Sequence, residues 1–391
     1  MINSRYMSST SSKSIFLPVI ALIFIGVIMV YSSTALLSVK KYGTGFHYLW
    51  SHLFTVFIGF AAMLLVSRLD YQKLRPLGTV LLAVSFVLLL VVFLPGIGLT
   101  ANGARRWIRL WPTTFQPSEL AKIAMVLFLA DYMDKNKYRM KKLVHGFIIP
   151  IAIMLTFQLA IIFQPDFGAV MSLGILTIGL LFLGGVTLRP LFAIILVALP
   201  GIFMLVKFFP YRWKRVTCFM DPWQDSLGCG FQLVQSFIAF GNGYITGVGI
   251  GSGRQKLAFL PEIHTDFIFS LIGEELGFLG VLAVIGLFLW LLIKGIIVAL
   301  ETDDPFSHYL ALGLTMMIGS QVIINLAVTI GLAPTKGLPL PLISYGGSSL
   351  LINMIAIGIL LNISGRNDRM KMERRGRPDI QAGHVSQRRG R

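Results

Sequence analysis

Apolar stretches close to the length of a membrane span recur along almost all of this 391-residue sequence. A helix needs about 20 apolar residues to cross the ~30 Å hydrocarbon core of a bilayer. With 55% hydrophobic and only 13% charged residues, the chain leaves no stretch of about 100 residues for a separate soluble domain. No alternating pattern of a membrane β-barrel is visible, so we predict an all-α polytopic membrane protein.

The apolar runs predict ten transmembrane helices. Their expected ranges are 15–37, 48–66, 77–95, 117–133, 146–163, 169–187, 190–208, 268–299, 308–331 and 341–363. The first range lacks the flanked cleavage site of a signal peptide, and we expect it to be retained as a span. The predicted organisation is an N-tail over 1–14, a membrane domain over 15–363 with a large outer loop near 209–267, and a basic, disordered C-tail over 364–391.

The basic residues predict the orientation of the chain. An even number of spans places both termini on one side of the membrane. Most of the 34 Lys and Arg lie in the two tails and in the loops on that same side, which the positive-inside rule makes cytoplasmic. Because the net charge of +17 is dispersed among loops, we expect contact with anionic lipid and none with nucleic acid.

Cys218 and Cys229 both fall in the large outer loop. Two cysteines exclude a disulfide framework or a Cys-based zinc site. A single bridge is possible if the loop faces an oxidising compartment. We expect two separate thiols instead.

The stretch LAFLPEIHTDFIFSLIGEELG, residues 257–277, concentrates acidic groups in a chain that has few. It holds four of the 17 Asp and Glu, namely Glu262, Asp266, Glu274 and Glu275. An ionisable group at a membrane is costly to hold there and is a functional hypothesis by default. Asp266 precedes the eighth span, where it either acts chemically or caps the helix. We expect His264 to position or hydrogen-bond, and Glu274 and Glu275 to bond to neighbouring helices.

Basic residues on the outer side go against the positive-inside rule, so their presence there needs an explanation other than topology. Those between the third and fourth spans, in NGARRWIRLWPTTFQPSELAK, are Arg105, Arg106 and Arg109. In the fourth span Lys122 follows Glu119 by three residues, which places both on one helix face. Two interpretations stay open: the pair neutralises itself inside the bundle, or these cations form a wall for a phosphorylated lipid headgroup.

Three further connections contain Gly, and two of them also contain Pro. In QPDFG, Asp166 is expected to cap the following helix. The spaced glycines of GNGYITGVGIGSGRQK follow no strand and precede no Walker lysine, so we reject a nucleotide loop and expect flexible or re-entrant backbone. The segment GLAPTKGLPLPLISYGGSS carries Lys336, Ser344 and Tyr345, and we expect it to shape a pocket.

Taken together, these motifs resemble the SEDS family of cell-wall proteins, the FtsW and RodA group, over nearly the whole chain. The resemblance rests on NGARRWI with QPSELAK, on QPDFG, on FQLVQSFIAFGNG, on LPEIHTDFIFSLIGEELG and on PTKGLPLPLISYGGSS, all in family order. The Lys of PTKG and the basic C-tail are more similar to the division members than to the elongation members.

The resemblance implies a peptidoglycan glycosyltransferase that polymerises lipid II into glycan strands at the outer face of the cytoplasmic (inner) membrane, at the division septum. Its implied partners are the growing glycan strand, a class B penicillin-binding transpeptidase and other division proteins. The family's essential acid maps to Asp266, and its basic residues map to Arg106 and Lys122. Further substrate-binding candidates are Glu119, His264, Lys336, Ser344 and Tyr345.

The expected chemistry needs a base for the acceptor 4-hydroxyl and cations for the departing pyrophosphate. No cofactor is required by these residues. A divalent cation (Mg²⁺ or Mn²⁺) stays open, although Glu262, His264 and Asp266 are not a recognisable ligand set. The alternatives are a lipid II flippase, an elongation-type polymerase and a scaffold without catalysis. A flippase would place its charges near the midplane, whereas these candidates gather toward the outer face.

Overall fold

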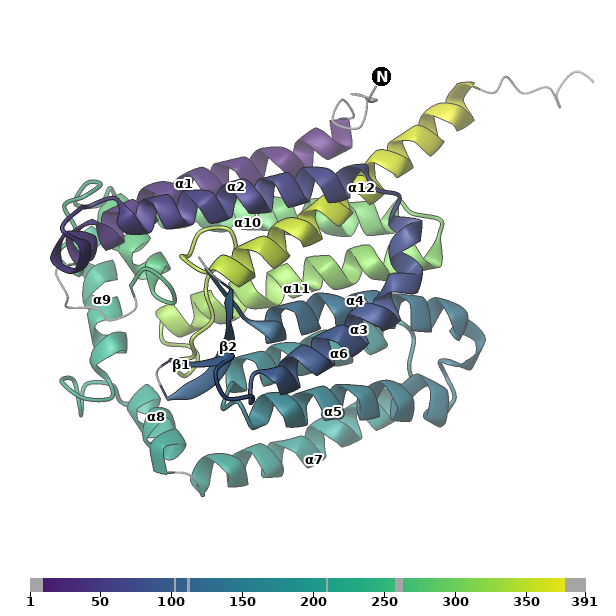
Figure 1. Ribbon diagram of the computed structural model, residues 1–391, viewed down its shortest axis with the longest axis horizontal. Helices are drawn as coiled ribbons and strands as arrows, with labels where there is room; N and C mark the ends of the chain where they lie inside the picture. The colour runs from purple at the N-terminus through teal and green to yellow at the C-terminus, as the bar shows by residue number, and fades with distance from the viewer. Residues whose placement is uncertain (1–9, 102, 111–112, 209, 257–262, 377–391) are drawn as a thin grey trace, which may run out of the picture.

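The protein is described here by a computed structural model, in which residues 10–101, 103–110, 113–208, 210–256 and 263–376 are placed. Long helices lie side by side along the longest axis of the molecule (Figure 1). Within the described residues, a helix occupies each of the ten ranges expected from the apolar runs. They are α1 (Thr10–Tyr42), α2 (His47–Arg68), α3 (Leu74–Val91), α4 (Pro117–Lys135), α5 (Ile149–Ile162), α6 (Phe167–Leu183), α7 (Leu188–Lys207), α10 (Ile268–Leu300), α11 (Pro305–Thr329) and α12 (Gly347–Gly376).

Seven of the described helices are long and apolar enough to cross a membrane, which makes the chain a multi-pass membrane protein. In the most apolar window of α12, 83% of the residues are buried inside the protein, against 17% for α2. Helix α12 is therefore a core element, whereas α2 presents most of its apolar surface outward, as lipid contact requires. Helix α4 is buried along most of its length although it carries charged residues.

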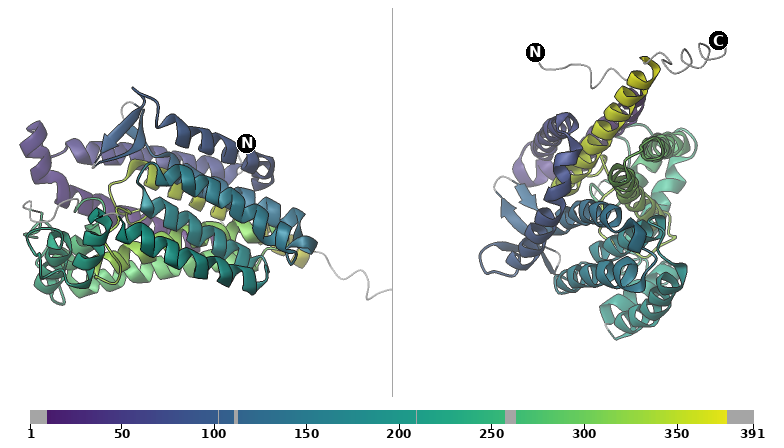
Figure 2. Two further views of the ribbon diagram at one scale, coloured as in Figure 1. Left: turned by 90° about the horizontal axis from the view of Figure 1, so that it is seen from below. Right: turned by 90° about the vertical axis from the view of Figure 1, so that its right-hand side faces the viewer.

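The two ends of the bundle differ in what they contain (Figures 1 and 2). The start of α1 and the end of α12 lie at the same end. The opposite end carries a small sheet and the helices α8 (Pro210–Met220) and α9 (Phe231–Gly243). We call this the loop end. Helix α12 continues to Gly376, so residues 364–376 of the expected C-tail are helical, and the rest of that tail lies outside the described residues.

The connection between α3 and α4 forms an antiparallel sheet that the sequence analysis did not anticipate. Its strands are β1 (Gly98–Ala101), β2 (Ala104–Leu110) and β3 (Thr113–Phe115), in the order β1-β2-β3. Gly103, with φ +74°, lies in the turn between β1 and β2, where the left-handed backbone favours glycine. Backbone N–H and C=O groups at a bilayer surface need hydrogen-bond partners, and the pairing of these short strands provides those partners. The sheet fixes the position of β2, which carries the outer arginines.

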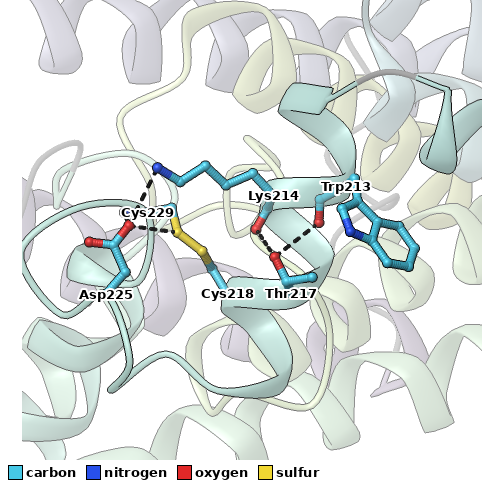
Figure 3. The surroundings of a disulfide bond; sticks show 6 residues. All are labelled: Trp213, Lys214, Thr217, Cys218, Asp225 and Cys229. Carbon is cyan, nitrogen blue, oxygen red and sulfur yellow. Dashed lines mark hydrogen bonds and ion pairs between the residues drawn. A yellow bond between two sulfur atoms is a disulfide. The ribbon is translucent and has the colours of Figure 1, made fainter.

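The described part of the large outer loop contains α8, α9 and a disulfide. Cys218 on α8 is bonded to Cys229, with their Cα atoms 6.0 Å apart (Figure 3). The expectation of two separate thiols is therefore wrong. Asp225 lies between the two cysteines in sequence and accepts a hydrogen bond from the Cys229 backbone N–H at 3.2 Å, which turns the chain so that the sulfurs meet.

Candidate active site

The segment that carries Asp266 lies at the loop end, directly before α10. The N-cap position of α10 is Phe267, so Asp266 is not the capping residue of this helix. The structure thus places Asp266 one residue before the helix cap. The Asp266 side chain is partly exposed, whereas the residues that follow it in α10 are buried.

Hydrogen bonds from two other elements fix the backbone around Asp266. The side-chain amide of Asn325 on α11 donates to the Asp266 carbonyl at 2.9 Å and to the Leu338 carbonyl at 2.8 Å. The Ser344 hydroxyl donates to the Thr265 carbonyl at 2.5 Å. Because Asn325 and Ser344 are 1% and 2% exposed, both act from within the protein, holding the Asp266 segment against the α11–α12 connection.

Arg106 and Asp266 converge on Gly337 in that connection. A Cβ atom placed on Gly337 would lie 3.2 Å from Asp266 Oδ2 and 3.8 Å from Arg106 Nη2. Glycine therefore leaves room for a carboxylate and a guanidinium to face the same space. The two groups come from residues 160 positions apart in the numbering, and the sheet and the α11–α12 connection bring them together.

Arg106 is held in place by a second aspartate. Its Nη1 lies 3.6 Å from Asp166 Oδ1. Asp166 is the N-cap of α6 and accepts a hydrogen bond from Ala169 N at 3.1 Å, which confirms its predicted capping role. Its other oxygen accepts from Gln116 Nε2 at 2.8 Å. Within the described residues the buried Nε of Arg106 has no hydrogen-bond acceptor, so this guanidinium keeps donor capacity.

Lys336 is adjacent to Gly337 and reaches the Met171 sulfur on α6. Burial against apolar groups lowers the pKa of its ammonium below the usual value for lysine. Lys336 is thus a second cation next to Gly337 in sequence.

Glu119 and Lys122 form an ion pair inside the bundle. Lys122 Nζ lies 2.7 Å from Glu119 Oε1, and the two side chains are 4% and 2% exposed for Glu119 and Lys122. These contacts match the first of the two interpretations of this spacing. Lys122 therefore does not face the same open space as Arg106.

Three aromatic rings border the Asp266 segment on its α2 side. The ring centroids of Tyr48, His264 and Tyr345 lie 5.7–6.1 Å from one another. The Tyr345 backbone N–H donates to the His264 carbonyl at 2.9 Å, and its hydroxyl donates to Ser51 Oγ at 3.1 Å. All three rings are partly exposed. We call them the aromatic cluster.

Sequence reasoning missed Gln116, Asn325 and Tyr48. Gln116 is the first residue of the QPSELAK motif but was given no role, and Asn325 is an amide inside an apolar helix, which is a signal for a buried polar contact. Glu262 lies outside the described residues. Among those described, the one group of acidic, His and Cys side chains close enough to share a metal is Cys218, Asp225 and Cys229, and its sulfurs are already bonded to each other.

Comparison with known proteins decides the family. Residues 12–369 match the FtsW/RodA/SpoVE family of cell cycle proteins. The chain belongs to this family. The match covers almost all of the sequence and confirms the SEDS resemblance drawn from its motifs.

Family members with curated names are close in sequence. A probable peptidoglycan glycosyltransferase FtsW from Geobacter metallireducens is 44% identical over 353 residues, which cover 90% of this chain and 94% of that protein. Another from Legionella pneumophila is 42% identical over 352 residues, covering 89% of each chain.

Solved structures of family members have the same fold. The rod shape determining protein RodA of Thermus thermophilus superposes with a TM-score of 0.67 at 27% identity, covering 90% of this chain and 95% of that one. A chain from a structure on polymerization and crosslinking by a peptidoglycan synthase complex gives a TM-score of 0.72 at 28% identity, covering 90% and 97%.

Proposed function

We propose that this chain is a division-type peptidoglycan glycosyltransferase that polymerises lipid II into glycan strands. The observation that carries the proposal is the convergence of Asp266 and Arg106 on Gly337. A carboxylate beside a guanidinium, both at the end of a helical bundle, supplies a base and an anion-binding group for the same reaction.

In the proposed reaction, Asp266 accepts the proton from the acceptor 4-hydroxyl as that oxygen attacks the anomeric carbon of the donor. The bond from this carbon to the lipid pyrophosphate breaks, and negative charge builds on the leaving phosphate oxygen. Arg106 and Lys336 stabilise that charge, because fixed cations act most strongly where charge develops and water is scarce. Lys122, paired with Glu119, supports the site from within α4.

The aromatic cluster is proposed to hold a sugar ring beside Asp266. Aromatic faces carry partial negative charge, and the C–H faces of a pyranose are apolar with a slight positive charge. Tyr48, His264 and Tyr345 offer such faces, and His264 stands two residues before the base. The hydroxyl to be deprotonated would then be oriented toward Asp266.

The loop end is proposed to face the outside of the cytoplasmic membrane. The Cys218–Cys229 disulfide lies at this end, and disulfides persist in oxidising compartments. The Lys- and Arg-rich connections lie at the opposite end, which the positive-inside rule makes cytoplasmic. This orientation gives Asp266 access to lipid II and to the glycan strand on the outer side.

The proposed partner is a class B penicillin-binding transpeptidase at the division septum. Support comes from the similarity to relatives named FtsW and from the solved peptidoglycan synthase complex that couples polymerization to crosslinking. Other division proteins would bring the pair to the septum.

The test is glycan synthesis from lipid II by the purified protein with its partner, whose transpeptidase site is blocked. We expect Asp266→Ala to lower the polymerisation rate on the order of 10²- to 10⁴-fold, the usual contribution of a general base. The matched control is Asp221→Ala, an exposed aspartate in the large outer loop, which should polymerise normally. Unchanged polymer from the Asp266→Ala protein would refute the proposed role, and lipid II transfer between leaflets without polymer would indicate a flippase.

A further inference from the structure

Helix α10 is interrupted two to three turns after Asp266, and the glycine-rich segment fills the interruption. The break is at Gly277, whose φ is +66°. An unbroken helix would bond the N–H groups of residues 278 and 279 to the carbonyls of residues 274 and 275. Here Phe278 N donates to Tyr244 O at 2.9 Å and Leu279 N donates to Ile245 O at 3.1 Å.

The carbonyls released by this break are also taken by the glycine-rich segment. Val248 N donates to Glu274 O at 3.0 Å, and Gly249 N donates to Glu275 O at 3.1 Å. Each broken helical bond is thus replaced by two bonds to residues 244–249. The inserted segment therefore continues the hydrogen bonding of α10 instead of leaving it open.

Glycine makes this insertion possible at two positions. A Cβ atom on Gly247 would lie 2.2 Å from Glu275 O, and one on Gly277 would lie 2.2 Å from Gly247 N. No side chain fits at such distances, and both residues have positive φ. The spaced glycines that superficially suggested a nucleotide loop are explained by this packing.

Two buried carboxylates just before the break extend the attachment to residues 253–255. Glu274 accepts hydrogen bonds from Arg254 N at 2.9 Å and from Gln255 N at 3.3 Å. Glu275 accepts from Gly253 N at 3.3 Å. Three consecutive backbone amides therefore point at two carboxylates that are 0% and 1% exposed. Charge-assisted bonds of this kind are stronger than bonds between neutral groups.

Glu275 also connects the segment to α1. The Ser32 hydroxyl donates to its two oxygens at 2.7 and 2.8 Å, and Lys256 Nζ lies 3.2 Å from Oε1. Lys256 additionally donates to the Ser32 oxygen at 3.3 Å. The carboxylate of Glu275 thus joins three parts of the chain at one point.

These contacts fix the part of α10 between Ile268 and the break at Gly277, because they bond it to residues 253–256 and to α1. Asp266 stands two residues before this part of the helix. We infer that Glu274 and Glu275 are positioning residues that hold Asp266 at the distance from Arg106 that the reaction needs. This inference rests on the proposed function, because it concerns the same base.

The test compares Glu274→Gln and Glu274→Ala with the wild type. Glutamine keeps one acceptor oxygen for the two amides, whereas alanine keeps none, so the effect should be graded. We expect Glu274→Ala to lower kcat on the order of a hundredfold with KM for lipid II nearly unchanged, as for a displacement of about 1 Å. Hydrogen exchange at the amides of residues 253–255 should be faster in Glu274→Gln than in the wild type, and fastest in Glu274→Ala.

The matched control is Glu301→Ala. Glu301 ends the same helix at the opposite side of the bundle, where it pairs with Lys371 at 2.7 Å. Its loss should leave kcat and exchange at residues 253–255 unchanged. Gly253→Ala is a second variant that leaves both acids intact. Its Cβ would lie 2.8 Å from Glu274 Oε2, so it should displace the carboxylate and reproduce the kcat loss.

A further measurement separates this inference from the proposed function. In an Asp266→Cys protein, the rate of labelling by a water-soluble maleimide reports the position of residue 266 without turnover. Adding Glu274→Ala should change that rate, and adding Glu301→Ala should not. If the wild type makes no polymer, the proposed function fails while labelling and exchange still decide the positioning role. Unchanged labelling or exchange in the Glu274→Ala proteins, or normal kcat despite faster exchange, would overturn it.

Discussion

Two aspartates that look alike in the sequence have different surroundings in the fold. Asp166 and Asp266 are each followed by Phe, and each stands just before a helix at the loop end. Asp166 is 4% exposed, caps α6 and bonds to Gln116. Asp266 is partly exposed, and the cap position of its helix is Phe267. Both approach Arg106.

The difference shows that two acids near the same cation, Arg106, can have different roles. The oxygens of Asp166 accept hydrogen bonds from Ala169 N in α6 and from Gln116, so its carboxylate is fixed. The negative charge of this fixed carboxylate holds Arg106 in place. Asp266 is held through its backbone carbonyl, which accepts a hydrogen bond from the side-chain amide of Asn325. An acid whose backbone is fixed while its side chain is partly exposed is suited to exchange a proton with a substrate.

The largest expected contrast comes from replacing each aspartate by asparagine. Asp266→Asn removes the base, and kcat should fall on the order of 10²- to 10⁴-fold. Asn caps a helix about as well as Asp, so Asp166→Asn should keep the α6 cap and lose only its charge beside Arg106. We expect a change mainly in KM for that variant. Steady-state polymerisation kinetics measure both, and equal losses of kcat would mean that the two acids do not differ in role.

A smaller effect is expected from Gly337→Ala. The new methyl group would meet Asp266 Oδ2 at 3.2 Å, so the carboxylate must yield by a few tenths of an ångström. We expect kcat to fall about tenfold, less than the hundredfold that a full 1 Å displacement can cost. Gly346→Ala in the same connection is the control, because its Cβ would meet its nearest neighbours at 3.5 Å. Equal rates for the two variants would argue against a reaction space at Gly337.

The smallest effect is expected from Lys336→Arg, measured as a pH profile. Burial lowers the pKa of Lys336, so its ammonium loses its proton at a lower pH than an exposed lysine would. The part of the rate that depends on this charge should therefore fall as pH rises through the lowered pKa. Arginine stays protonated, so the alkaline side of the kcat profile should move to higher pH. An unmoved profile would place Lys336 outside the reaction.

The sequence predicted the helices well because each span needs a long apolar run, and such runs are visible without any partner. It proposed Asp266, Arg106 and Lys336 through the family motifs, and it correctly predicted from position alone that Asp166 caps a helix. These features depend on local composition and on local hydrogen bonds.

What could not be predicted depends on contacts between distant segments. The approach of Arg106 and Asp266 to Gly337 requires the sheet, α10 and the α11–α12 connection to be placed together. The strands β1–β3 are short and mixed in polarity, so they give no clear alternation. The break at Gly277 lies inside an apolar run that fits an unbroken helix, and only the inserted residues 244–249 explain it.

The bond between Cys218 and Cys229 has a practical consequence for anyone handling the protein. Closing a ring of roughly this size removes freedom from the unfolded chain, worth about 3 kcal/mol by loop-entropy arguments for 15 residues. A preparation kept in thiol reductant would lose that contribution in the segment that joins α8 to α9. Samples purified with and without reductant are thus expected to differ in the stability of that segment.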